Sequence, residues 1–285
     1  MTTAVVGTAG IAVRGLGKRY RKSVALHDCT FDLPEGRVAA LVGANGAGKT
    51  TLLTVLSGLL RPDSGGFELR PDERVAFVAQ EKPVYKHFTP KDVLRLGARL
   101  NLEWDQARAS AWLERFDIPV DRRCGQLSGG QRTQVALAVA IGSRPSLLLL
   151  DEPLADLDPL ARTEVMRELL SEVAESGTTV ILSTHIVTEL AGVVDHLLLL
   201  AHGKLLVGGD LDELLTAHVM VVGPRADRPP VEGEVLWDKH LDGQSLFLVR
   251  VSSTPAVSAP WVVRPVTLED YVLARLSATR KGGSA

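Results

Sequence analysis

The sequence has little cysteine and almost no excess of charge. Its two cysteines, Cys29 and Cys124, are too few for a disulfide framework and do not follow a metal-ligand spacing, which fits a reducing compartment. The formal net charge of −2 gives no indication of a surface that binds nucleic acid. We therefore expect no nucleic-acid partner.

Long hydrophobic runs are also missing. Runs such as Leu147–Leu150 and Leu197–Ala201 are far too short to span a bilayer. The first ten residues lack the basic start and apolar centre of a signal peptide. With 285 residues, 45% hydrophobic and 23% charged, the chain suits one folded domain plus an appendage, or two modest domains. We expect a soluble chain that reaches a membrane only through a partner.

What is present begins with a glycine-rich stretch, Gly43–Thr51. It follows an apolar run typical of a strand, Val38–Val42, and precedes helical spacing over Lys49–Leu60. The glycines permit a tight turn whose N–H groups point at an anion near the positive end of the helix. Lys49 can reach the β- and γ-phosphates of a nucleotide, and Thr50 can offer its hydroxyl to Mg²⁺. The stretch predicts a nucleoside triphosphate site.

Two carboxylates follow another predicted core strand. Asp151 and Glu152 come directly after Leu147–Leu150. In α/β sheets, ligands lie at the carboxyl ends of the strands. Asp151 can therefore serve Mg²⁺, directly or through water, and Glu152 can polarise a water for attack on the γ-phosphate.

Two further polar residues end predicted strands of the same sheet. Gln80 follows Val75–Val78, and His185 follows the strand over Thr178–Leu182. A glutamine at such a place is more often an ordinary loop residue. A lone histidine is usually unremarkable too, but its expected place on the same sheet edge as Asp151 favours a role in the site.

A second anion site is indicated by Leu127–Gln131, which reads LSGGQ before a helical run. Ser128 can cap that helix, and the paired glycines leave its first amides accessible. Helical spacing over Thr89–Leu100 and Trp104–Phe116 interrupts the strand–helix alternation. We interpret about residues 81–140 as a helical insertion.

The ends of the chain carry less chemistry. Strands are expected over Ile11–Tyr20 and Leu26–Leu33, and Tyr20 could equally be a half-buried strand residue or a ring stacked on a base.

Other expected segments are a turn at Arg61–Gly66, helices at Leu160–Ala174 and Glu189–Val194, and strands at Leu197–Leu200 and Lys204–Val207. Near residue 218 proline and glycine increase. We expect one domain over residues 1–218 and a small extension over 219–285, with short strands, a helix at Leu268–Leu276 and a disordered tail from Thr279.

Taken together, these motifs resemble the ATP-binding cassette of ABC transporters over residues 11–217. Gly43–Thr51 matches the Walker A motif, Gln80 the Q-loop, Leu147–Glu152 the Walker B motif and His185 the switch histidine. Leu127–Gln131 matches the family's own signature, which separates it from other phosphate-loop proteins. Asp158 falls in the D-loop, and Tyr20 falls where the family stacks adenine.

The resemblance implies a RecA-like α/β phosphate-loop core, an antiparallel β edge subdomain, a helical insertion and a small α+β C-terminal extension. It implies ATP and Mg²⁺ as ligands and a head-to-tail pair of cassettes, either a homodimer or two different ones. ATP would be held by residues of one subunit and by the signature of the other. The implied nucleotide-binding residues are Tyr20, Gly43, Asn45, Gly46, Gly48, Lys49, Thr50, Thr51, Ser128, Gly129, Gly130, Gln131 and Asp158.

The resemblance also assigns the reaction. Glu152 would be the general base, while Gln80 and His185 would sense the γ-phosphate and Mg²⁺. The metal ligands would be Thr50, Gln80 and Asp151. Two residues depart from the family pattern: Gln134 replaces a usual arginine, and Asp156 replaces a small residue, adding negative charge near the dimer seam.

The stretches 153–215 and 266–273 are similar to cassettes of the ABC-2 type, which are commonly bacterial exporters. The chain would then sit on the cytoplasmic face of the membrane and drive a permease encoded as a separate chain. The alternative is a soluble ABC ATPase that acts on nucleic acid or the ribosome. Such proteins usually have two cassettes, a long coiled-coil insertion or a basic surface, and this chain has none of these.

Overall fold

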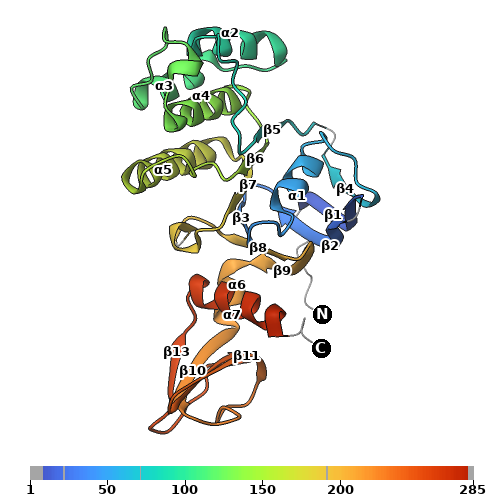
Figure 1. Cartoon of the computed structure of the whole chain (residues 1–285), viewed down its shortest axis with the longest axis vertical. Helices are drawn as coiled ribbons and strands as arrows, with labels where there is room; N and C mark the ends of the chain where they lie inside the picture. Colours follow the sequence, from blue (N-terminus) through green and yellow to red (C-terminus); the bar gives the residue numbers. More distant parts are fainter. Residues whose placement is uncertain (1–8, 22, 71, 191, 282–285) are drawn as a thin grey trace.

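The computed structural model describes residues 9–21, 23–70, 72–190 and 192–281. Its largest sheet has six strands in the order β5-β6-β7-β3-β8-β9 (Figure 1). Five run parallel, and β9 is antiparallel to β8. The strands are β3 Val38–Val42, β5 Val75–Val78, β6 Leu147–Asp151, β7 Thr179–Thr184, β8 His196–Ala201 and β9 Lys204–Asp210. Strands β3, β6, β7 and β8 are buried throughout, as expected for apolar runs covered on both faces.

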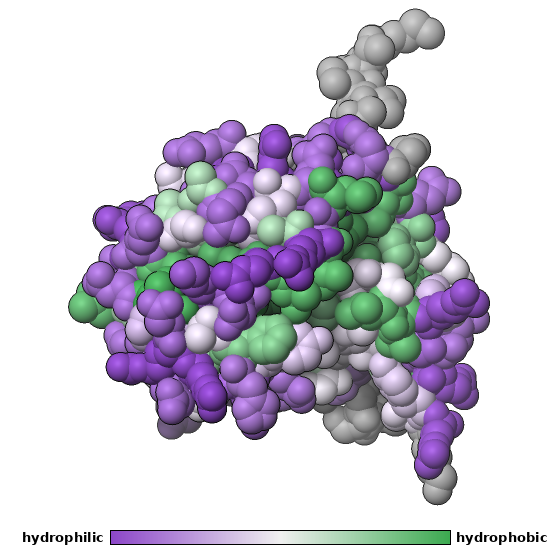
Figure 2. Space-filling view, turned by 90° about the horizontal axis from the view of Figure 1, so that it is seen from above, coloured by the Kyte–Doolittle hydropathy of each residue, from purple (hydrophilic) through white to green (hydrophobic). Residues whose placement is uncertain are grey.

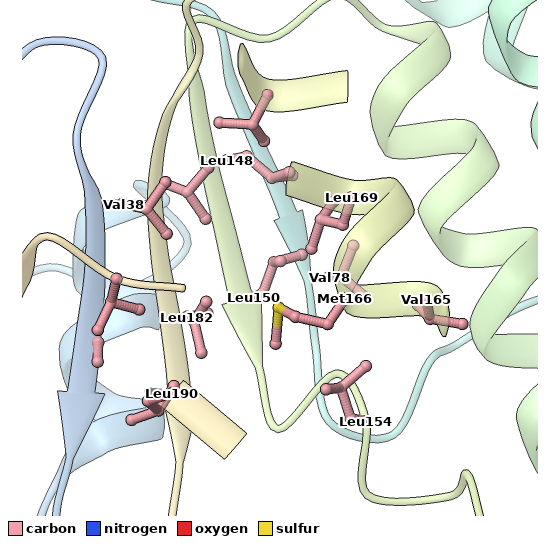
Figure 3. Packing of buried hydrophobic residues seen from close by; sticks show 14 of the residues in the cluster. Val38, Val78, Leu148, Leu150, Leu154, Val165, Met166, Leu169, Leu182 and Leu190 are labelled. Atoms are coloured by element: carbon pink, nitrogen blue, oxygen red, sulfur yellow. The ribbon is translucent and has the colours of Figure 1, made fainter. Parts of the chain in front are cut away.

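The two faces of this sheet carry two hydrophobic clusters. Along β6, Leu148 and Leu150 face helix α5 (Pro159–Ser176) and pack with Leu169, as Figure 3 shows. Leu147 and Leu149 point the other way, into the cluster that contains helix α1 (Lys49–Leu56). This alternation follows from the two-residue period of a strand. It confirms the predicted α/β core with helices on both faces.

A smaller antiparallel sheet, β2-β1-β4, packs against the α1 side of the core. It is made of β1 (Ala9–Tyr20), β2 (Ser23–Pro34) and β4 (Ser64–Leu69). The turn predicted over residues 61–66 is wrong from Ser64 on, because β4 pairs there with β1. Gly65 has φ +63°, and a side chain on it would collide with the Gly15 carbonyl. Gly65, one of the two glycines that suggested a turn, therefore allows close backbone approach instead.

The predicted helical insertion is present and lies at one end of the molecule (Figure 1). It contains α2 (Pro90–Leu100), α3 (Gln106–Arg115), a 3₁₀ turn η1 (Cys124–Gln126) and α4 (Gly129–Gly142). Thr89 caps α2 and Ser128 caps α4, each in a reciprocal box with the residue three positions later.

The C-terminal part forms a four-stranded antiparallel sheet, β11-β12-β10-β13, joined to the core by α6 (Leu211–Thr216) and α7 (Leu268–Lys281). Its strands are β10 His218–Pro224, β11 Glu234–Leu241, β12 Gln244–Arg250 and β13 Val262–Pro265. The tail expected to be disordered from Thr279 is helical through Lys281, and residues 282–285 lie outside the described residues.

The helix predicted over residues 189–194 is wrong. Among its described residues, the segment holds only a 3₁₀ turn, η2 (Val187–Leu190), and Gly192 has φ +73°, which ends any helix there. Leu190 is buried in the same cluster as Leu268, Tyr271 and Val272 of α7, so the turn is fixed by packing rather than by helical periodicity. Over the described residues, we find no helix that combines the length and the apolarity needed to cross a membrane.

Candidate nucleotide site

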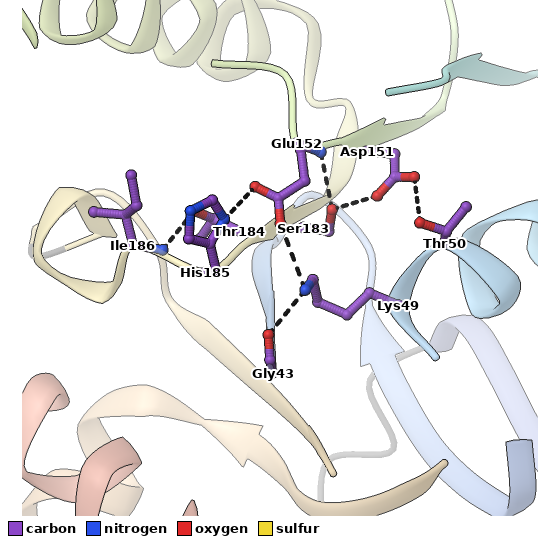
Figure 4. Close-up of polar contacts among 9 residues, drawn as sticks. All are labelled: Gly43, Lys49, Thr50, Asp151, Glu152, Ser183, Thr184, His185 and Ile186. Carbon is purple, nitrogen blue, oxygen red and sulfur yellow. Dashed lines mark hydrogen bonds and ion pairs between the residues drawn. The ribbon is translucent and has the colours of Figure 1, made fainter. Parts of the chain in front are cut away.

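Strands β3, β6 and β7 are adjacent in the sheet, so the residues that follow them meet at one edge. Val42 lies beside Thr184, and Asp151 lies beside Ser183. This register brings Gly43, Asp151 and the residues around Ser183 together, as Figure 4 shows. Residues more than a hundred positions apart in sequence form one cluster because the strand order is not the chain order.

The phosphate loop adopts a backbone that only glycine accepts at two positions. Gly48, at the start of α1, has φ +109°, and a Cβ there would lie 2.5 Å from the Ala25 carbonyl oxygen. A Cβ on Gly43 would collide with the Leu200 carbonyl. The loop therefore lies tightly against its neighbours at the start of a helix, a position where backbone N–H groups can bind an anion.

Lys49 is folded back over the loop. Its side chain is buried, and its ammonium donates to the Gly43 carbonyl at 2.8 Å. The same nitrogen lies 3.5 Å from Glu152 Oε1. Lys49 thus neutralises Glu152 while it lies where phosphate oxygens would bind.

Asp151 is fully buried and accepts two short hydrogen bonds. Thr50 Oγ1 donates to one carboxylate oxygen at 2.7 Å, and Ser183 Oγ donates to the other at 2.6 Å. Ser183 also accepts the Glu152 N–H at 2.9 Å. Ser183 was missed by the sequence reasoning; the signal was a hydroxyl side chain within a buried strand, where it must have a partner.

Glu152 is held from three sides. Its φ of +46° is in the left-handed region, which is unusual for a glutamate and costs free energy unless the surroundings impose it. Its side chain is buried, and Oε2 lies 2.9 Å from His185 Nδ1. Lys49 and His185 thus hold the carboxylate at the mouth of the loop, while Ser183 holds the Glu152 backbone.

One cavity of about 410 Å³ joins most of the predicted nucleotide-binding residues. Its lining comes from five separate segments of the chain. Of the predicted residues, it includes Tyr20, Asn45, Gly46, Gly48, Lys49, Thr50, Thr51, Gln80, Glu152 and His185. Tyr20 is 46% exposed, so its ring is available to a ligand at the edge of the cavity. Ala25 and Ala155 also line it, although their side chains carry no chemical signal in the sequence.

The signature residues do not line this cavity. Ser128 Oγ accepts the Gln131 N–H at 3.1 Å, and Gln131 Oε1 accepts the Ser128 N–H at 3.0 Å. Asp158 caps α5 by accepting the N–H groups of Leu160 and Ala161. Within a single chain, Ser128, Gly129, Gly130, Gln131 and Asp158 are therefore kept apart from the phosphate loop, and their role in nucleotide binding stays a prediction.

Gln134, one of the two departures from the family pattern, has a structural partner. It is buried, and its Oε1 accepts the indole N–H of Trp112 at 2.9 Å. The neutral Gln134 side chain thus joins α4 to α3 through this hydrogen bond.

Comparison with known proteins supports the motif assignment. A family model described as ABC transporter matches residues 26–155. The aliphatic sulfonates import ATP-binding protein SsuB of Corynebacterium glutamicum is 38% identical, over 72% of this chain and 86% of the relative. The chain belongs to the ABC transporter family. It is an ATP-binding subunit and an ATPase.

Other ABC relatives match over nearly the whole chain. The Nod factor export ATP-binding protein I of Ralstonia nicotianae is 30% identical over 92% of each chain. The ABC transporter ATP-binding protein YtrB of Bacillus subtilis is 26% identical over 95% of this chain and 99% of its own. A solved structure of an ATP-binding subunit of an ABC transporter has a TM-score of 0.64 and 27% identity over 72% of this chain and 91% of its own. Because the relatives include import and export proteins, family membership leaves the direction open.

Proposed function

We propose that this ABC cassette binds Mg²⁺-ATP in the 410 Å³ cavity, pairs head to tail with a second cassette and couples hydrolysis to export through a separate permease. The observation that carries the proposal is the convergence of Lys49, Thr50, Asp151, Glu152 and His185 on one sheet edge. Phosphoryl transfer needs positioning and charge stabilisation, and these side chains supply both.

Lys49 and Glu152 have linked roles in this mechanism. An incoming nucleotide offers Lys49 phosphate oxygens in place of the Gly43 carbonyl and Glu152. Once Lys49 turns to the phosphates, Glu152 is free to accept a proton from the attacking water. His185 Nδ1, 2.9 Å from Glu152, keeps the carboxylate aimed while its exposed ring reaches toward the γ-phosphate side of the cavity.

The residues around Asp151 fit a magnesium ion. Mg²⁺ prefers oxygen ligands and usually binds one or two carboxylates together with substrate phosphates. Thr50 Oγ1 and Asp151 Oδ2 are 2.7 Å apart, so one ion can meet both. Thr50 and Gln80 line the cavity, whereas Asp151 is fully buried next to Thr50. When bound, the ion would neutralise charge on the phosphates.

A second cassette would supply the signature residues, which do not line the phosphate-loop cavity of their own chain. Helix α4 begins with Gly129 and Gly130, and its amides and dipole favour an anion. These residues lie outside the phosphate-loop cavity of their own chain. A head-to-tail pair would let α4 of one subunit meet the γ-phosphate held by the other, which supports a composite site.

A groove beside the helical insertion supports a membrane partner. It has a volume of about 240 Å³ and an apolar lining that includes Phe77, Val84, Leu96 and Val139. Tyr85 and Leu100, which also line it, are 63% and 73% exposed, and Leu102 nearby is fully exposed. Figure 2, which views the end of the molecule that carries α2 and α3, shows hydrophobic surface gathered between hydrophilic residues. We propose that a short apolar segment of the permease docks here, at the cytoplasmic face of the membrane.

The coverage of the relatives favours export. The Nod factor export protein aligns over 92% of this chain and therefore includes most of residues 219–285. The import relatives SsuB of Corynebacterium glutamicum and ModC of Mycobacterium tuberculosis align over 72% and 76%. The C-terminal extension is thus shared with an export protein.

The decisive test is Glu152→Gln. Removing the base should lower ATP turnover at least a hundredfold, while ATP binding is kept, so an ATP-bound dimer should accumulate. Phosphate release and light scattering after size exclusion measure the two effects. Glu175→Gln, on the exposed side of α5, is the matched control and should behave like wild type. Turnover retained in Glu152→Gln would show that another group is the base.

The membrane partner has its own test. The tagged chain, captured from detergent-solubilised membranes, should bring down a polytopic membrane protein. Loss of that protein with Leu100→Glu would support docking in the groove. Recovery of ribosomes or DNA without a membrane protein would instead support the soluble alternative.

A further inference from the structure

Lys82 and Asp156 join two loops of the nucleotide site by an ion pair. Lys82 Nζ donates to Asp156 Oδ2 at 2.8 Å. The lysine side chain is 3% exposed and the aspartate side chain 48% exposed. Lysine is almost never fully buried unless it is paired. Among the residues that the structure describes, Asp156 is the only ion-pair partner of Lys82.

The backbone bends to make this contact. Lys82 follows Gln80 by two positions and has φ +43°, a left-handed conformation that is costly for a lysine. Its N–H donates to the Ala79 carbonyl at 2.9 Å, closing a turn around Gln80. The ion pair with Asp156 therefore forms at the cost of a strained backbone and a buried charge at Lys82.

Asp156 lies against the start of α4. A Cβ built on Gly129 would lie 3.2 Å from Asp156 Cβ and 3.6 Å from Asp156 Oδ2. A Cβ on Gly130 would lie 2.7 Å from Leu157 Cδ2. An unpaired carboxylate at this place would be drawn to the free amides of α4 and would repel any other anion that approached them.

We propose that Lys82 is a positioning residue that fixes the Asp156 carboxylate and neutralises its charge beside the first residues of α4. The signature turn then stays open for the γ-phosphate carried by the paired cassette. This inference rests on the proposed composite site. It also explains how the chain accommodates Asp156, the charged residue that replaces a small residue of the family pattern. Without Lys82, the negative charge of Asp156 would oppose the approach of the γ-phosphate at the seam.

Because Lys82 is buried and Asp156 is half-exposed, variants of the two residues can separate the effect of charge from the effect of packing. Lys82→Met leaves Asp156 half-exposed and charged beside α4. Asp156→Asn in the Lys82→Met background removes that charge and leaves no buried ammonium without a partner. Lys82→Arg keeps the positive charge and should retain wild-type behaviour if charge is the feature that matters.

The test measures kcat and KM for ATP and, in the Glu152→Gln background, the ATP concentration at which half of the protein is dimeric. Lys82→Met should raise both the KM and this concentration about tenfold, with kcat at saturating ATP changed less than about twofold, because repulsion opposes closure rather than chemistry. The defect should shrink at high salt, which screens the exposed charge. Lys82→Met/Asp156→Asn should recover to within about twofold of wild type. Lys91→Met, on the exposed side of α2, is the control.

Two results would overturn the inference while leaving the proposed function intact: an unchanged KM in Lys82→Met, or a double variant no better than Lys82→Met. The second result would mean that Lys82 acts through packing alone, since packing does not respond to the charge of residue 156. Wild-type protein that neither hydrolyses ATP nor dimerises would instead overturn the proposed function, and the inference with it.

Discussion

At the scale of single residues, Ser183 shows how a side chain outside every motif organises the site. Its hydroxyl donates to Asp151 Oδ1 at 2.6 Å and accepts the Glu152 N–H at 2.9 Å. It thereby links the proposed metal ligand to the proposed base and helps to hold Glu152 in its left-handed backbone conformation. All three residues are buried, so none can exchange these bonds for water at low cost.

Ser183→Ala should therefore damage both stability and catalysis. It leaves the Glu152 N–H without its acceptor and Asp151 with one donor fewer, which should lower the free energy of unfolding by about 1–3 kcal/mol. We expect kcat to fall more than tenfold, since Glu152 loses its backbone anchor. Urea unfolding and ATPase kinetics measure the two losses.

Thr163→Ala, which removes an exposed hydroxyl from α5, is the control for Ser183→Ala. If Ser183→Ala changed stability but not kcat, the link from Ser183 to Glu152 would have no part in the reaction.

At the scale of elements, capping and packing set where each helix lies. Ser128 and Gln131 form a reciprocal cap at the start of α4, so the signature sequence is also a helix-initiation signal. Gln134, one turn further on, accepts the Trp112 N–H and joins α4 to α3. The signature helix is therefore attached to the helical insertion, which also lines the groove proposed for the permease.

Gln134→Leu should loosen the insertion. The substitution removes the acceptor of a buried indole N–H, at a cost of about 1–3 kcal/mol in unfolding free energy. Because α3 is then held less firmly to α4, hydrogen exchange in α3 should speed up while exchange in the strands of the six-stranded sheet stays near wild type.

Gln106→Leu is the comparison for Gln134→Leu, since Gln106 accepts an indole N–H from Trp104 in an exposed bond. Equal losses of stability in the two variants would show that the buried bond contributes no more to stability than the exposed one.

At the scale of the whole molecule, the C-terminal extension shares a core with the cassette. Leu268, Tyr271 and Val272 of α7 are buried in the same cluster as Leu190 and Leu199. Residue 190 ends the turn that follows His185, so α7 packs on the segment next to the proposed γ-phosphate sensor. We infer that the extension stabilises this part of the nucleotide site.

Val272→Asp should destabilise the entire chain. Val272 is 1% exposed, and an unpaired charge at this place should lower the free energy of unfolding by about 3 kcal/mol or more. Since the core is continuous, calorimetry should record one transition at a lower temperature, not an early transition of the extension alone.

Leu273→Asp is the matched control for Val272→Asp, because the neighbouring Leu273 is 56% exposed. Two separate transitions in Val272→Asp would mean that the extension and the cassette unfold independently.

The sequence alone determined the features that are local or strongly periodic. The phosphate loop, the apolar strands that end at Asp151 and near His185, and the capped start of α4 all carry their signal within about ten neighbouring residues. Glycine, proline, capping and alternation act over that range, and for that reason Lys49, Thr50 and Glu152 could be predicted as site residues before the fold was known.

Only the tertiary structure decided the features that depend on distant partners. The strand β4 was hidden because Gly65 serves a close approach to β1, and the helix expected near Glu189 gave way to a turn packed under α7. The Lys82–Asp156 pair crosses 74 positions, and the Ser183–Asp151 bond crosses 32. Contacts of this kind are set by strand order and by burial, where an ion pair or hydrogen bond forms because water is excluded, and no local pattern in the chain encodes them.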